Sequence, residues 1–274
     1  MAKGLDFAFK PHPSVHAIKA DGAEWAGRYI SSLPANDTNG KNLLKAERDE
    51  LLAAGLKIIL FVEEGAESMK GGHAAGAAHA QHAVAVARAL GMDGIPFYYT
   101  ADWDATPADQ TAINAYLDGA ISVHGLPRTG IYGGYYVVKR VLDAGKATYS
   151  CQTRAWSGGQ WDPRANIRQG PTVTVGGASC DVDDSRTADY GQWPRPHVLP
   201  PGPAGFHGEY VTTGQLSLAQ LADKLGVPAS ALLRMTAVHY KTFGDPLAGW
   251  LNAVHDGAKP ASTPLPARIR FWVD

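Results

Sequence analysis

The chain has 274 residues, enough for one large domain or for a medium and a small one. Its 25 basic and 26 acidic residues nearly balance, which gives no electrostatic reason to expect a nucleic-acid or anionic-membrane partner. No apolar run approaches the length of a membrane span. Cys151 and Cys180 are too few for a disulfide framework, so two buried thiols are expected, with a single bridge as the alternative.

Strand and helix patterns alternate along about the first 195 residues. Strands are expected over residues 4–9, 25–30, 57–62, 96–101, 129–132, 147–155, 165–169 and 179–182. Helices are expected over residues 42–55, 72–90, 107–124 and 135–144. This alternation predicts a parallel sheet, and about eight strands favour an α/β fold, a compact (β/α)8 TIM-type barrel with some helices reduced. A doubly wound open sheet is the alternative, but no glycine-rich phosphate-binding motif follows the first strand.

Residues 96–104 form an apolar and aromatic run that ends in Asp102 and Asp104. On an extended strand, residues two apart point to the same face, so both carboxylates would project into the same space. Two carboxylates held together are suited to acid–base chemistry on a sugar. The alternative is that these aspartates cap the helix that follows.

Acidic side chains stand at or near the ends of several predicted strands. They are Asp6, Glu63, Glu64, Asp102, Asp104, Asp181, Asp183 and Asp184. In a barrel these strand ends share one rim, and active sites are built on that rim. Rings beside carboxylates suit a carbohydrate groove, and the aromatic residues near the rim are Tyr29, Tyr98, Trp103, Tyr132 and Trp156. The alternative is that the acids cap helices or form ion pairs with Arg28, Arg154 and Arg168.

The chain changes character after residue 193. Residues 194–205 are rich in proline and are typical of a semi-stiff linker between a domain over 1–193 and a small unit over 206–274. In that unit, helices are expected over residues 217–226, 228–235 and 247–254, and a closing strand over 268–273.

Motifs in the first domain resemble a known family. They are Gly4-Leu5-Asp6, residues 97–104 and residues 130–135, with Gln152, Trp156, Gln169 and residues 180–183 fitting the later strands. Over about residues 3–193 the chain resembles the glycoside-hydrolase-like family known as domain of unknown function 1906. That family is similar to the family 25 lysozymes, which are muramidases. The resemblance implies the barrel fold and a glycan substrate.

The resemblance also implies roles for individual residues. The family 25 enzymes carry Asp-x-Glu in the fourth strand with the Glu as general acid, which matches Asp102 and Asp104 here. Asp104 is one methylene shorter than that Glu, so Glu63 or Glu64 is an alternative source of the acid. Asp6 is a further implied catalytic residue, which would hold the sugar and tune the pKa of the acid. The implied substrate-binding residues are Arg28, Tyr29, Tyr98, Tyr132, Gln152, Trp156, Gln169, Asp181 and Asp183.

The tail, residues 206–274, resembles a LysM module, a small α+β fold that binds peptidoglycan. The matching segments are residues 208–211, 218–222, 225–228, 232–233 and 265–266. The tail departs from the LysM pattern over residues 243–257, which are predicted to be an inserted helix, and at Thr236, where Asn is usual. The alternatives are a docking or assembly module and a helical cap on the barrel.

The resulting hypothesis is a lysozyme-like glycoside hydrolase of the endolysin type, which cleaves bacterial cell-wall peptidoglycan and is targeted by its tail. No metal or organic cofactor is implied, because acids suffice for the reaction and His79 and His82 lack a third ligand. The alternative is a weak or inactive barrel that serves as a cell-wall-binding, phage-tail or injection-particle component, docked through the tail. The N-terminus lacks the apolar core of a signal peptide, so we expect cytoplasmic synthesis and access to the wall after lysis or particle-mediated export.

Overall fold

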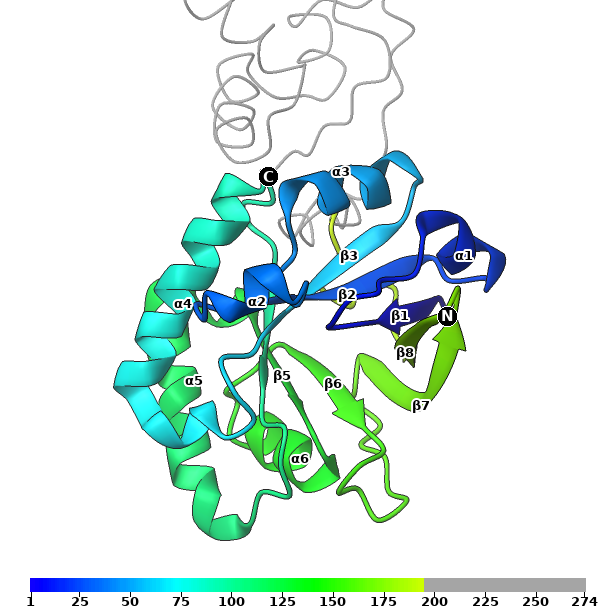
Figure 1. The fold of residues 1–274 in the computed structure, drawn as a ribbon. Helices are drawn as coiled ribbons and strands as arrows, with labels where there is room; N and C mark the ends of the chain where they lie inside the picture. The colour runs from blue at the N-terminus through cyan, green and yellow to red at the C-terminus, as the bar shows by residue number, and fades with distance from the viewer. Residues whose placement is uncertain (195–274) are drawn as a thin grey trace, which may run out of the picture. The chain divides into compact units, whose positions relative to one another are not determined.

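The computed structural model describes residues 1–194, which form a closed barrel of eight strands (Figure 1). Most strands are rich in β-branched and aromatic residues, which suit a pleated surface buried on both faces. The strands are β1 Lys3–Asp6, β2 Trp25–Ile30, β3 Lys57–Val62, β4 Phe97–Thr100, β5 Thr129–Gly133, β6 Tyr149–Thr153, β7 Ile167–Val175 and β8 Ala178–Ser185. Apart from Pro194, the predicted linker over 194–205 and the predicted LysM-like unit over 206–274 lie outside the described residues.

Strand direction departs from the prediction at the end of the barrel. Strands β1 to β7 pair with their sequence neighbours in parallel, but β8 is antiparallel to both β7 and β1. The predicted barrel is confirmed, whereas the expectation of a wholly parallel sheet is wrong at β8. The reason is the connection, because only Gly176 and Gly177 separate the paired residues Val175 and Ala178. Both glycines have positive φ, at 57° and 84°, and a two-residue turn of this kind can only reverse the chain.

Helices follow each of the first five strands and cover the outside of the barrel (Figure 1). They are α1 Val15–Ala20, α2 Ala35–Thr38, α3 Lys45–Ala53, α4 Gly72–Ala89, α5 Gln110–His124 and α6 Tyr135–Asp143. No helix lies between β6 and β8 in the described part of the chain, so the prediction of reduced helices is confirmed. Helices α1 and α2 were not predicted, because elements of six and four residues are too short to show a helical period.

Helices α4 and α5 lie side by side along one flank of the barrel (Figure 1). Two glycines make their close contact: a Cβ atom on Gly76 would lie 1.9 Å from the Tyr116 carbonyl oxygen, and one on Gly119 would lie 2.1 Å from that of His73. The helix backbones therefore touch directly at these positions. The alanine-rich composition of α4 reflects this packing. No helix within residues 1–194 is long and apolar enough to cross a membrane.

The inside of the barrel is filled by a layer of large side chains. Its buried members are Trp25, Ile59, Phe61, Tyr98, Tyr149, Cys151, Ile167 and Tyr190. Fully burying a side chain of this size contributes about 1.5–3 kcal/mol, so the layer is a major source of stability. Cys151 lies in this layer and Cys180 lies in the outer core, and both thiols are free and buried as expected.

The direction of β8 decides which acids reach the rim formed by the carboxyl ends of the parallel strands. Asp6 is the last residue of β1 and pairs with Asp181 in the middle of β8. Asp183 pairs with Gly4, one level deeper in the barrel. Because β8 is antiparallel, the acid that reaches this rim precedes Asp183 in the chain and does not lie at the C-terminal end of the strand.

Candidate active site

Asp6 is the centre of a hydrogen-bonded network inside the rim. Its side chain has room because a Cβ atom on Gly27, across the β1–β2 pair, would lie 2.6 Å from the Asp6 Cβ. The Tyr29 hydroxyl donates to Asp6 Oδ1 at 2.6 Å, and Gln169 Nε2 donates to Asp6 Oδ2 at 2.8 Å. The Tyr132 hydroxyl in turn donates to Gln169 Oε1 at 2.8 Å. Four strands, β1, β2, β5 and β7, thus hold one carboxyl group in place.

Asp6 and Asp183 form a pair of buried acids. Burial raises the pKa of Asp6 to about 6, the charge of Asp181 adds to this effect, and the bonds from Tyr29 and Gln169 oppose it. Asp183 is fully buried, and neither of its carboxyl oxygens receives a hydrogen-bond donor. Burial, followed by the neighbouring charge of Asp6, raises the pKa of Asp183 well above its usual value. Burial and the proximity of the two carboxyl groups therefore both disfavour a doubly charged pair.

A second pair of acids lies at the ends of β3 and β4. Asp102 is half-buried, and burial together with the nearby charge of Glu63 raises its pKa, against the opposing charge of Lys41. Glu63 forms an ion pair with Lys41, and the Lys41 Nζ lies 5.3 Å from the centroid of the Tyr29 ring. Since Glu63 also acts on the pKa of Tyr29, these groups lie in one electrostatic neighbourhood with Asp6.

Asp104 has a different environment from Asp102. Strand β4 ends at Thr100, so the alternation rule for extended strands does not hold at residues 102 and 104. Asp104 is exposed, whereas Asp102 is half-buried and its backbone N–H donates to the Ala66 carbonyl oxygen at 3.2 Å. The two aspartates therefore differ in their exposure to solvent, and burial raises the pKa of Asp102.

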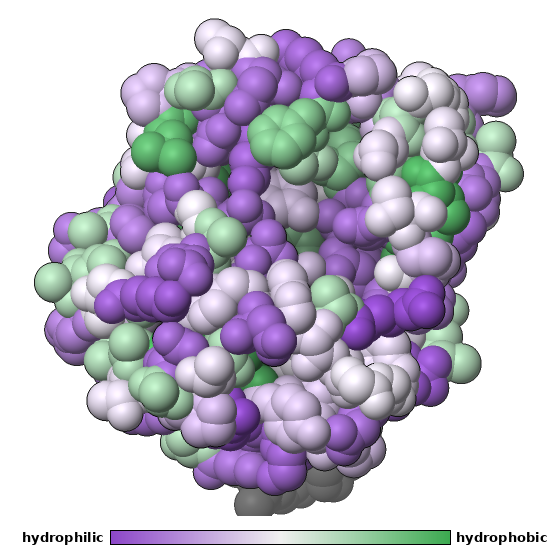
Figure 2. Space-filling model, turned by 60° about the horizontal axis from the view of Figure 1, so that its bottom comes forward, coloured by the Kyte–Doolittle hydropathy of each residue, from purple (hydrophilic) through white to green (hydrophobic). Residues whose placement is uncertain are grey.

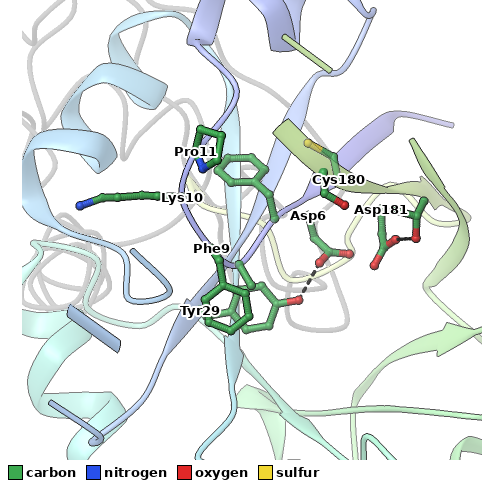
Figure 3. Close-up of a pocket in the computed structure, with 11 residues that line it drawn as sticks. Asp6, Phe9, Lys10, Pro11, Tyr29, Cys180 and Asp181 are labelled. Atoms are coloured by element: carbon green, nitrogen blue, oxygen red, sulfur yellow. Dashed lines mark hydrogen bonds between the residues drawn. The ribbon is translucent and has the colours of Figure 1, made fainter. Parts of the chain in front are cut away.

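A pocket of about 300 Å³ opens beside Asp6 (Figure 3). In Figure 3, Phe9 and Tyr29 lie on one side, Cys180 and Asp181 on the other, and Asp6 between them. The lining residues are Asp6, Phe7, Ala8, Phe9, Lys10, Pro11, Tyr29, Thr172, Ser179, Cys180 and Asp181. The pocket is thus walled by the loop after β1 on one side and by the β7–β8 hairpin on the other.

The face of the molecule drawn in Figure 2 is mainly hydrophilic. Its hydrophobic side chains occur in small separate groups rather than in one broad patch. Broad apolar patches mark protein or membrane contacts, whereas mixed polar surfaces with single rings suit hydroxyl-rich ligands.

Several of the other residues singled out in the sequence have structural partners. Glu64 accepts hydrogen bonds from the hydroxyl groups of Ser31 and Ser32 at 3.0 and 2.8 Å, and so fastens the loop after β2. The Gln152 side chain is bonded to the loop that follows β6, through the Gln160 carbonyl at 2.8 Å and the Asp162 N–H at 2.8 Å. These contacts show that both side chains brace loops around the rim.

The remaining predicted residues divide between the interior, the rim and the outer face. The Tyr98 hydroxyl donates to the Tyr190 carbonyl oxygen at 2.7 Å within the buried layer. Trp156 is exposed on the loop after β6, and the Thr172 hydroxyl donates to Asp181. Arg28 lies on the outer face of β2, where it binds Glu47 of α3. The structure therefore brings Asp6, Tyr29, Tyr132, Gln169 and Asp183 together and places Arg28 apart from them.

Two residues of the rim, Lys41 and Phe9, were not among the predicted site residues. Lys41 lies in a loop, where no periodic pattern indicates which way a side chain points. Phe9 was expected at the end of a strand over residues 4–9, but β1 ends at Asp6 and Phe9 lies in the loop that follows. A pair of histidines on α4 was considered for metal binding, and the His79 Nδ1 instead lies 2.7 Å from the Tyr116 hydroxyl. Within residues 1–194 no group of three or more histidine, cysteine or acidic side chains is arranged to hold a metal ion.

Comparison with known proteins adds to this geometry. The model of the family described as Rv2525c-like, glycoside hydrolase-like domain matches residues 16–187. Crystal structures of the Mycobacterium tuberculosis Tat-secreted protein Rv2525c, in complex with HEPES or with L-tartrate, are similar to this chain at 29% identity and a TM-score of 0.66. These alignments cover 70% of this chain and 98% of that chain.

Two further structures are more distant. An uncharacterized B. stearothermophilus protein is 18% identical over 68% of this chain and 96% of its own, with a TM-score of 0.50, which shows a common fold alone. The Clostridium perfringens spore cortex lytic enzyme SleM is 15% identical over 67% of each chain, and its TM-score of 0.44 is too low to support an argument. No curated protein matches the sequence.

Proposed function

This chain belongs to the Rv2525c-like, glycoside hydrolase-like family, and from that premise we propose that it hydrolyses a glycosidic bond in a cell-wall glycan. The motif resemblance to the family 25 muramidases supports bacterial peptidoglycan as the substrate. Glycoside hydrolysis needs one acid that is protonated and one carboxylate that is charged. The observation that carries the proposal is the pair of Asp102 and Glu63, neighbouring carboxyl groups in contrasting environments.

Each acid of the rim has a role in this proposal. Asp102 protonates the leaving oxygen, because its raised pKa keeps a proton available nearer to neutral pH. Glu63, which forms an ion pair with Lys41, stabilises the positive charge that develops on the sugar or attacks the anomeric carbon as its bond to the leaving oxygen breaks. Asp6 binds sugar hydroxyl or amide groups, because each of its oxygens already receives a protein donor and is poorly placed to attack.

Asp104, which the motif resemblance pairs with the general acid, serves as the matched comparison. It is exposed, and burial is what raises the pKa of a catalytic carboxylic acid toward neutrality. We therefore assign the acid role to Asp102 and expect Asp104 to contribute less.

The proposal extends to the tail. Residues 206–274 act as a LysM-like module that keeps the barrel on its insoluble substrate, or as a docking module for a phage or injection-particle protein. Their LysM-like motifs support the first of these roles. An endolysin-type enzyme would use such a module to concentrate the barrel on the wall.

The direct test is product analysis with purified peptidoglycan. The full chain is incubated with the walls, the soluble products are reduced with borohydride, and the reduced amino sugars are identified by mass spectrometry. Reduced N-acetylmuramic acid ends would support a muramidase. Walls that bind the protein yet release no new reducing ends would argue against hydrolysis.

One observation favours a second candidate, a glycan-binding barrel without turnover. The rim acids are heavily occupied: Asp6 by Tyr29 and Gln169, Glu63 by Lys41, and Glu64 by two serines. Carboxylates whose orientation is fixed by such hydrogen bonds and ion pairs are well suited to bind a ligand in a fixed orientation. The same product analysis separates this candidate from the hydrolase.

A further inference from the structure

The pocket beside Asp6 has an aromatic wall that the proposed reaction does not use. We propose that Phe9 is the stacking face of a subsite for one amino-sugar ring, in the pocket between the loop after β1 and the β7–β8 hairpin. The inference rests on the proposed function, since it assumes a glycan ligand. It adds a binding residue that lies outside every motif of the sequence.

The Phe9 ring is largely exposed to solvent. Phe9 is 55% exposed, although it lies at a pocket of about 300 Å³ (Figure 3). Covering an exposed ring with an apolar ligand surface favours binding, because it removes apolar surface area from water. The C–H face of a pyranose ring is such a surface, and aromatic rings provide a flat apolar partner for it.

The loop that carries Phe9 is fixed in advance. Buried Arg28 donates to the Phe7 carbonyl oxygen and, at 2.9 Å, to that of Gly40. The Lys10 backbone N–H donates to the Asn39 carbonyl oxygen at 3.0 Å. The Lys41 Nζ lies 5.6 Å from the centroid of the Phe9 ring, a cation–π contact. A ring held in this way loses little conformational entropy when a ligand binds.

The opposite wall supplies acceptors for the polar edge of a sugar. Asp181 accepts a hydrogen bond from Thr172, and Asp6 accepts one on each oxygen, from Tyr29 and from Gln169. A carboxylate has about four lone-pair sites, so both groups retain capacity for sugar O–H or N–H donors. Figure 3 places Phe9 and Asp181 on opposite sides of Asp6, so a ring on Phe9 would direct its edge toward the acids.

Calorimetric titration with soluble peptidoglycan oligosaccharides tests the subsite. The full chain carries Asp102→Asn so that the probe is not consumed, and Phe9→Ala and Phe9→Tyr are compared on this background. Leu126→Ala is the matched control, because Leu126 is also exposed but precedes β5 at the opposite end of the barrel. We expect Phe9→Ala to raise the Kd about tenfold or more, Phe9→Tyr to preserve binding, and Leu126→Ala to have no effect.

The outcomes separate this inference from the proposed function. If the Kd of Phe9→Ala lies within about twofold of the Kd of its parent, the proposed subsite is wrong. In that case, release of reducing ends by the wild type would still support the proposed hydrolase. If Phe9→Ala loses binding and the wild type releases nothing, the subsite stands as part of a binding barrel. If the parent protein binds no oligosaccharide, the subsite is wrong irrespective of the activity. Thermal melting of each variant checks that a loss of binding does not come from unfolding.

Discussion

At the scale of single residues, the barrel buries two neighbouring acids, Asp6 and Asp183, at a place where two charged carboxylates would repel each other strongly. Asp6 and Asp183 are both buried, and two neighbouring carboxylates cannot both ionise cheaply in a medium of low dielectric. The hydroxyl of Tyr29 and the amide of Gln169 stabilise a charge on Asp6, while Asp183 receives no donor. Asp183 is therefore the member that keeps the proton.

This pair predicts a pH-dependent stability. Because folding raises the pKa of Asp6 from 3.8 to about 6, its contribution to stability is full below about pH 4 and is lost as the pH rises through 6. The loss corresponds to about 3 kcal/mol. Residue 6 does not titrate in Asp6→Asn, so the free energy of unfolding of this variant relative to wild type should rise by about 2 kcal/mol between pH 4.5 and pH 8, since part of the loss has already occurred at pH 4.5.

Chemical denaturation at the two pH values measures this difference, with Asp104→Asn as the exposed control. A stability difference between Asp6→Asn and wild type that is the same at both pH values would show that Asp6 titrates normally.

Lys41 leads to a second prediction at this scale. Its positive charge lowers the pKa of Asp102, so Lys41→Met should raise that pKa. A proton donor with a higher pKa stays protonated to higher pH, and the alkaline limb of the pH–rate profile should move upward. Lys139→Met is the control, since Lys139 is an exposed lysine of α6 whose charge is paired with Asp143, away from the pocket. An alkaline limb that stays in place or moves downward in Lys41→Met would argue against Asp102 as the acid.

At the scale of elements, one buried ion pair joins a strand, a helix and two loops. The Arg28 Nε donates to Glu47 Oε1 at 2.6 Å, and the same guanidinium binds the loop carbonyls of Phe7 and Gly40. Burial raises the pKa of Glu47, but hydrogen bonds from His12 and Arg28 outweigh it and hold that pKa below its usual value. Arg28 thus connects β2 and α3 to the loop that carries Phe9.

Arg28→Met should therefore destabilise the fold by about 3 kcal/mol, because it leaves Glu47 and two carbonyl groups without their donor. Hydrogen exchange at residues 7–12 should accelerate more than exchange in β5. Arg154→Met, at an exposed arginine, should change the free energy of unfolding by less than about 0.5 kcal/mol. Equal exchange rates in both variants would mean that other contacts hold the loop.

The sequence contained a signal for this role of Arg28. Neighbouring residues of a strand point to opposite faces, so Arg28 and Tyr29 could not both face the interior. With Tyr29 bonded to Asp6, Arg28 had to face the helices. The same rule places Cys151 in the inner layer and leaves its neighbour Gln152 to brace a loop.

At the scale of the whole molecule, the alternation of patterns predicted the barrel and most of its strands and helices. The direction of β8 was missed, although Gly176-Gly177 between two strands is itself a hairpin signal. Residues 170–171, Gly-Pro, interrupt the apolar pattern of β7, and the strand continues past them with a shift in register between Gln169 and Thr172. The periodicity of the sequence therefore predicted that these strands exist more reliably than it predicted the residues at which they end.

Part of the acidic rim was expected from strand ends, since Glu63 and Asp102 follow the apolar runs of β3 and β4, whereas Asp6 fell inside a strand predicted over residues 4–9 that in the structure ends at Asp6. What the sequence could not supply was the contribution of loops. Lys41 and Phe9 reach the site only because Arg28 and backbone hydrogen bonds fold their loops over it. Such contacts join residues far apart in the chain and leave no local pattern.

The measurement that tests the central claim most directly is the rate of reducing-end release from purified peptidoglycan by wild type, Asp102→Asn and Asp104→Asn. With Asp102 as the general acid, Asp102→Asn should lower the rate by a factor on the order of 10² or more, while Asp104→Asn should keep most of the activity. Equal thermal melting of all three proteins shows that the barrel is folded in each of them. Full activity in Asp102→Asn, or its loss in Asp104→Asn alone, would contradict this assignment of the acid.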